Sequence, residues 1–196
     1  MYKNKLQKKI QENKPQFIGI PIETKVSTNI FTFDLSSSID STQVSKNVLE
    51  YKNKYPESNS TYVNAWHSFF YTHKNTNLFD DLITIVENKV SIILQNRSKK
   101  AKAKVAQSWV IIYNKGGYTK PHIHFDTTYT AVYYAKVEEN PSPLLFTPTI
   151  KIFPKESMLV CFPGYLEHSV PKMENDGERI VVAFNLNCLL RENEDE

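Results

Sequence analysis

The sequence has no long apolar run, few cysteines and little net charge. No stretch of the 196 residues approaches 18 apolar residues, which excludes a membrane-spanning helix from the sequence. The lysine-rich N-terminus carries no apolar core of a secretory signal, so we expect no such signal. The two cysteines, Cys161 and Cys188, do not make a disulfide framework. We therefore expect a reducing, cytoplasmic setting.

The net charge of +3 is too small to indicate nucleic acid as a partner, and nothing indicates a membrane partner. The densest group of lysines lies in residues 99–104, where we expect a solvated loop or helix end. Arginine is scarce. The chain has only three, Arg97, Arg179 and Arg191, so each is a candidate for a specific role. The length and the ordinary hydrophobic content of 40% fit one domain with a real core.

The first half of the chain predicts a polar arm, one strand and two helices. Residues 1–15 have the composition of the arm, and the alternation near the end of 18–33 favours an early strand. Capping residues before 42 predict a helix over about 42–54, which ends before Pro56. Apolar residues recur every three to four positions over 78–94 and predict a second helix, with Asn77 as a candidate N-cap.

After residue 106 the pattern changes to short β-branched and aromatic runs separated by turn signals. Their centres lie eight to fourteen residues apart without helical periodicity, which is typical of an antiparallel sandwich or barrel. We predict an α+β, mainly β fold, with the N-terminal helices on one face of the β core. Residues 191–196 read as an acidic tail.

Three histidines in the β half could form a metal site. His122 and His124 are two apart in an expected strand start, so their side chains leave the same face. Asp126 continues that face and competes with them for two coordination positions. His168 lies 44 residues after His124, and a hairpin or jelly-roll return could place it opposite the pair. Three such ligands on one face of iron leave three positions open, as in non-haem Fe(II) oxygenases.

The remaining candidates have simpler readings. We expect His67 and His73, which lie among aromatic residues, to be structural histidines, and Cys161 to be a small core residue. Arg179 opens the apolar run RIVVAFNLN, where a buried guanidinium would need a partner such as a bidentate carboxylate. A surface position after the turn ENDGE is the other reading of Arg179.

Two segments of the chain resemble the 2-oxoglutarate/Fe(II)-dependent dioxygenase superfamily. They are WVIIYNKGGYTKPHIHFDTTYTAVYY and SMLVCFPGYLEHSVPKMENDGERIVVAFN. The resemblance covers about residues 105–190 and is strongest to a branch of small oxygenases of bacteria and phages, related to prolyl-hydroxylase-type domains. It implies a double-stranded β-helix (jelly-roll) core, Fe(II), and 2-oxoglutarate as cosubstrate. It also implies hydroxylation of a C–H bond with O₂, release of succinate and CO₂, and a cytoplasmic location in a bacterial cell or phage-infected host.

Carried over by position, His122, His124 and His168 match the metal ligands. Arg179 matches the residue that pairs with the far carboxylate of 2-oxoglutarate, and Tyr113 and Tyr134 lie where such domains often contact the cosubstrate. When an HxD motif is counted from His122, the position of its usual aspartate is occupied by His124. A second frame uses His124 and Asp126 as the HxD pair; we favour the first. A three-histidine site carries one negative charge less than a triad with a carboxylate.

Two other classes stay open. A cupin-like protein could hold a metal with three histidines and no 2-oxoglutarate, in which case Arg179 would be dispensable. A degenerate binding module would have kept the fold and lost the metal. Residues 17–104 are expected to support the core and to build the substrate lid. They carry no signature of a peptide, sugar, nucleobase or small-metabolite substrate. The kinship to prolyl-hydroxylase-type domains slightly favours a protein or an amino acid as the substrate.

Overall fold

The computed structural model describes residues 27–58, 60, 62–146 and 149–190. The predicted polar arm, most of the predicted early strand and the acidic tail lie outside these residues. Within them, no helix has both the length and the apolar character that crossing a membrane requires.

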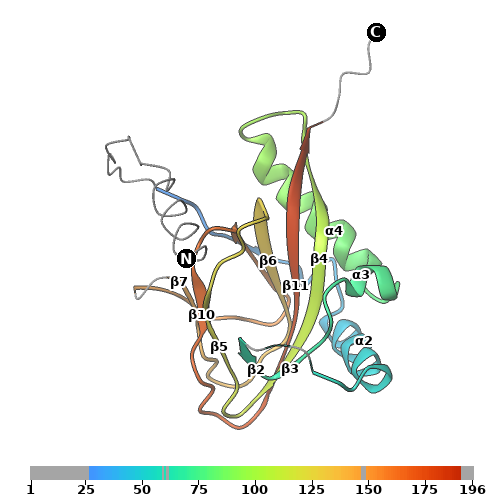
Figure 1. Cartoon of the computed structure of the whole chain (residues 1–196), viewed down its shortest axis with the longest axis vertical. Helices are drawn as coiled ribbons and strands as arrows, with labels where there is room; N and C mark the ends of the chain where they lie inside the picture. The colour runs from blue at the N-terminus through green and yellow to red at the C-terminus, as the bar shows by residue number, and fades with distance from the viewer. Residues whose placement is uncertain (1–26, 59, 61, 147–148, 191–196) are drawn as a thin grey trace, which may run out of the picture.

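The β core consists of two antiparallel sheets (Figure 1). The larger sheet has the order β1-β9-β6-β11-β4-β3, and the smaller one has the order β2-β5-β10-β7-β8. The strands of the larger sheet are β1 (Phe31–Asp34), β3 (Trp66–His67), β4 (Ala101–Asn114), β6 (Tyr129–Lys136), β9 (Met158–Pro163) and β11 (Glu178–Leu190). Those of the smaller sheet are β2 (Val63–Asn64), β5 (Tyr118–His122), β7 (Leu144–Phe146), β8 (Ile150–Ile152) and β10 (His168–Val170). This is the predicted jelly-roll core.

Helices α2 (Ser41–Lys54) and α4 (Asp80–Gln95) cover the outer face of the larger sheet, as predicted (Figure 1). In α2, Val44, Val48 and Tyr51 are buried at helical spacing, and the Asp40 carboxylate caps the first turn. The short helix α3 (Thr72–Asn75) precedes α4. The predicted cap at Asn77 is wrong: α4 begins after Phe79 without a side-chain cap, and Asn77 contributes only its backbone carbonyl.

The larger sheet is apolar on both faces because it separates two cores. One core lies between this sheet and the helices, and the other lies between the two sheets. Neighbouring residues on β6 alternate between them: Tyr133 packs in the helical core and Tyr134 in the core between the sheets. The candidate site lies in this second core.

Two β-bulges interrupt the larger sheet. On β4, Gln107 pairs with Asn185 and Val105 pairs with Leu186, so Ala106 is an extra residue. On β6, Tyr134 pairs with Val181 and Lys136 pairs with Ile180, so Ala135 is extra. Each bulge shifts by one the alternation of side chains between the two faces of its strand.

Candidate metal centre

A cavity of about 560 Å³ lies between the two sheets. Its walls are mostly apolar and aromatic, and they include Trp109, Ile111, Val132 and Val181. All three histidines of the predicted triad line it, together with Arg179, Tyr113 and Tyr134. A largely apolar cavity with a few converging polar groups is typical of a ligand site.

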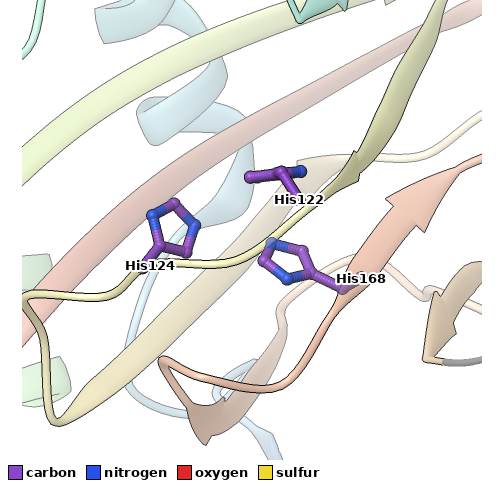
Figure 2. A group of neighbouring side chains, drawn as sticks. All are labelled: His122, His124 and His168. Carbon is purple, nitrogen blue, oxygen red and sulfur yellow. The ribbon is translucent and has the colours of Figure 1, made fainter. Parts of the chain in front are cut away.

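The structure brings His122, His124 and His168 together (Figure 2). One ligand atom from each lies within 4.8 Å of the others. His122 ends β5, and His168, which begins β10, is its direct partner in the antiparallel register. Their ring centroids are 4.2 Å apart, and the His124 ring lies 5.0 Å from His122 and 5.3 Å from His168. The expected return that places His168 opposite the pair is therefore present.

His124 reaches the cluster from a loop, so the predicted strand over His122–Asp126 is wrong. Strand β5 ends at His122, and the His124 backbone N–H donates to the carbonyl of Gly164 at 2.8 Å. A Cβ at position 164 would lie 2.4 Å from the Thr127 hydroxyl and 2.8 Å from the His124 carbonyl. Only glycine allows this close approach of the two loops, which holds His124 beside the ends of β5 and β10.

Asp126 lies in an exposed turn beyond His124 and is not among the clustered residues. The geometry therefore groups His124 with His122 and not with Asp126. No carboxylate of the described residues joins the three imidazoles.

Backbone carbonyls orient two of the imidazoles. The Nδ1 atoms of His122 and His168 lie 2.9 and 3.0 Å from the carbonyl oxygens of Lys120 and Leu166. A carbonyl can only accept, so each Nδ1 carries the proton and each Nε2 keeps a free lone pair. Metal-ligating histidines have this arrangement. His124 Nδ1 instead lies 3.2 Å from the Asn185 amide, and its buried Nε2 has no partner within the described residues.

Burial keeps the cluster uncharged. Removal from water lowers the pKa of His124 to about 4 and that of His168 to about 3, and the neighbouring imidazoles lower both further. Burial also lowers the pKa of His122. At neutral pH all three imidazoles are neutral, which is the form that binds metal ions.

Arg179 is fully buried, and its partner is a residue that the sequence analysis did not single out. Its Nε and one Nη donate to the two carboxylate oxygens of Glu138, with 2.9 Å between Nε and Oε2. The same Nη donates to the carbonyl of Ser142 at 2.6 Å. The reading of Arg179 as a surface residue is wrong, and the bidentate carboxylate is Glu138. The other nitrogen, Nη1, is buried without a partner in the described residues.

Tyr113 and Tyr134 flank Arg179 in the cavity wall. Tyr113 is the cross-strand partner of Arg179, and its hydroxyl lies 2.6 Å from that of Thr119. Burial raises the pKa of Tyr113 to about 12 and also raises the pKa of Tyr134. Both phenols therefore stay protonated and can donate a hydrogen bond to an anion.

The other singled-out residues have structural partners. His67 Nδ1 lies 2.6 Å from the Ser68 carbonyl, and His73 Nδ1 lies 2.8 Å from the Ser108 hydroxyl. Cys161 is buried in the core, and both cysteines are free. His67 also lines the cavity, stacked on Trp109.

Comparisons with known proteins agree with the fold and with the resemblance. Residues 139–185 match the family described as "Putative 2OG-Fe(II) oxygenase"; this range includes His168 and Arg179 but not His122 or His124. No curated protein sequence gives a match.

Several solved structures share the fold. The viral collagen prolyl hydroxylase of Paramecium Bursaria Chlorella virus-1, solved with 2-oxoglutarate, is 17% identical, with a TM-score of 0.58 over 80% of this chain and 94% of that one. The prolyl-4-hydroxylase of Pseudomonas putida is 12% identical, with a TM-score of 0.59 over 85% and 95%. A prolyl hydroxylase from Trichoplax adhaerens is 16% identical, with a TM-score of 0.62 over 81% and 83%.

These likenesses establish the fold, and the family match adds the segment that carries His168 and Arg179. The chain therefore shares the fold of solved 2-oxoglutarate/Fe(II)-dependent oxygenases, and its residues 139–185 are similar to the family described as "Putative 2OG-Fe(II) oxygenase".

Proposed function

We propose that this protein is a hydroxylase that binds Fe(II) through His122, His124 and His168 and holds 2-oxoglutarate against Arg179. The observation that carries the proposal is the convergence of three neutral imidazoles in one cavity that also contains a buried, partly unsatisfied guanidinium. When bound, Fe(II) and 2-oxoglutarate supply the oxidising chemistry, in which O₂ gives one oxygen atom to a substrate C–H bond and the other to succinate, with loss of CO₂.

Two buried polar atoms that have no partner among the described residues support the fit of these groups. His124 Nε2 is suited to a metal ion, and Arg179 Nη1 is suited to a carboxylate. Buried polar atoms normally have partners, so two orphans in one cavity indicate missing ligands. Glu138 fixes the guanidinium through its other edge, so Nη1 alone would donate to the far carboxylate of 2-oxoglutarate. Tyr113 and Tyr134 would line that carboxylate and keep water from it.

The substrate would enter past an aromatic rim. Tyr62, Phe70 and Phe125 line the cavity while remaining substantially exposed to solvent. Tyr62 and Phe70 belong to the segment 17–104 that is expected to cover the substrate. Arg179 is the one permanently charged residue of the described lining, so a substrate with an uncharged, apolar reacting part fits this cavity.

The testing experiment adds Fe(II) and 2-oxoglutarate, separately and together, to metal-free protein without oxygen and records the visible spectrum. We expect a weak charge-transfer band that needs both additions. Asp126→Ala should keep the band, because this carboxylate lies in an exposed turn. Absence of the band in wild-type protein that does bind iron would contradict the proposal.

Arg179→Lys isolates the cosubstrate contact, because lysine can keep the charge pair with Glu138 but has no second nitrogen to replace Nη1. A hydrogen bond to a charged group contributes about 1.5–3 kcal/mol, so the affinity for 2-oxoglutarate should fall about 10- to 100-fold. Iron affinity should not change.

One observation favours a second candidate, a three-histidine metal protein that does not use 2-oxoglutarate. Glu138 already provides Arg179 with a bidentate carboxylate, which would be a sufficient reason for a buried arginine. In that case Arg179→Lys would leave the spectra of the iron-loaded protein unchanged whether or not 2-oxoglutarate is present.

A further inference from the structure

A row of three polar side chains runs across β4, β11 and β6, and its two end residues, Gln107 and Thr130, line the cavity. Gln107 on β4, Asn185 on β11 and Thr130 on β6 are direct cross-strand neighbours. Asn185 is only 1% exposed, and its amide lies 2.8 Å from Gln107 Oε1 and 2.9 Å from the Thr130 hydroxyl. Its third contact is His124 Nδ1, at 3.2 Å. The sequence signal for Asn185 is a polar residue within the apolar run of β11.

The hydrogen bonds of this row can run in two directions, which differ in the orientation of two side-chain amides. In the first, the Asn185 nitrogen donates to Gln107 and to His124 Nδ1, and the Thr130 hydroxyl donates to the Asn185 oxygen. Neutral His124 then carries its proton on Nε2. That nitrogen is buried without an acceptor in the described residues, which disfavours this arrangement.

In the second, the amides of Asn185 and Gln107 are both turned by 180°, which exchanges their nitrogen and oxygen atoms. The Asn185 oxygen now accepts from Gln107 and from His124 Nδ1–H, and its nitrogen donates to Thr130. The lone pair of His124 Nε2 is then free and faces His122 and His168, as a metal ligand requires.

The other two histidines have no such choice, because backbone carbonyls at Lys120 and Leu166 fix their Nδ1–H form. Only His124 depends on an amide that can present either atom. We propose that Asn185 is a positioning residue, which turns its amide oxygen to His124 Nδ1 when a metal binds and so selects the metal-binding tautomer. The inference rests on the proposed triad, and Gln107 and Thr130 complete the switch.

Zn(II) provides a test that does not depend on activity, because it is diamagnetic and suits imidazole ligands. Long-range ¹H–¹⁵N NMR of the full chain at pH 7.5 reports the tautomer of each histidine. In the zinc-loaded protein we expect His124 to carry its proton on Nδ1 and to bind zinc through Nε2. Binding of zinc through Nδ1 of His124 would overturn the inference.

Zinc affinity, measured by competition with a chelating dye, separates the variants. Asn185→Leu should lose about 10- to 100-fold in affinity, since it cannot accept from Nδ1–H. Asn185→Asp should bind at least as tightly as wild type, because a carboxylate accepts from Gln107, Thr130 and His124 at once. The matched control is Asn187→Leu, two residues along the same strand and exposed. Thermal unfolding of the metal-free variants identifies any loss of folding.

Two variants distinguish a failure of the metal triad from a failure of the role of Asn185. If His168→Ala binds zinc as tightly as wild type, the triad and the proposed function fail. If His168→Ala loses zinc while Asn185→Leu keeps wild-type affinity, the triad stands and only the role of Asn185 fails.

Discussion

Replacing Glu138 with glutamine leaves the Arg179 guanidinium charged, buried and without a counter-charge. The two side chains are 1% and 0% exposed, so water cannot replace the lost carboxylate. Removing one partner of a buried ion pair costs about 3–5 kcal/mol, a large part of the stability of a domain. For a chain of this length, each kcal/mol lowers the melting temperature by about 2–4 °C, so we expect a decrease of roughly 6–20 °C.

Thermal and urea unfolding of the metal-free protein measure this effect. The matched control is Glu178→Gln, which removes the partner of Lys136 from a half-exposed pair with a 3.1 Å contact and should cost less than about 1 kcal/mol. The double variant Glu138→Leu/Arg179→Met should recover most of the loss, because neither charge then remains buried. A loss for Glu138→Gln no larger than that of the control would refute the reasoning.

Three further perturbations have defined outcomes. His168→Ala should abolish tight Fe(II) binding by equilibrium dialysis while the chain stays folded by circular dichroism; retention of iron would remove His168 from the site. For the metal-free protein, stability should be full above about pH 6.5 and should fall as the pH drops towards 5, because the unfolded chain protonates first while His124 and His168 keep lowered pKa values. A melting temperature that is constant over that interval would contradict those pKa shifts. Asp40→Ala removes a carboxylate 2.9 Å from the Thr42 N–H and should cost about 1 kcal/mol in urea unfolding, whereas an unchanged midpoint would show that the cap contributes nothing.

The elements that the sequence predicts well depend on local, repeated signals. Helix α2 begins at a capping aspartate, and α4 follows the apolar period of its buried face. The pairing of His168 with His122 could also be expected, because an antiparallel return of the chain is the simplest way to bring the two histidines side by side. The helices need only the pattern of one element at a time, whereas the pairing of the two histidines also needs the return of the chain from β5 to β10.

The predictions that fail or fall short depend on contacts between distant segments. The strand over His122–Asp126 is replaced by a loop because Gly164 draws the His124 backbone away from the sheet. Glu138 lies in the turn-like stretch EENPSP, and nothing near it in the sequence indicates that it meets Arg179, 41 positions later. Asn185 becomes a contact of His124 only through the register of β4, β11 and β6.

The extra residue Ala135 on β6 determines which side chain of the strand lies at the Arg179 end of the cavity. Thr130, Val132 and Tyr134 point into the cavity in strict alternation, and the next member of that series would be Lys136. Because the bulge reverses the alternation, Lys136 instead lies at the surface and pairs with Glu178. A single inserted alanine thus keeps a second cation out of the cavity. A dianion such as 2-oxoglutarate would then meet only the positive charge of Arg179, which favours one orientation of the bound molecule.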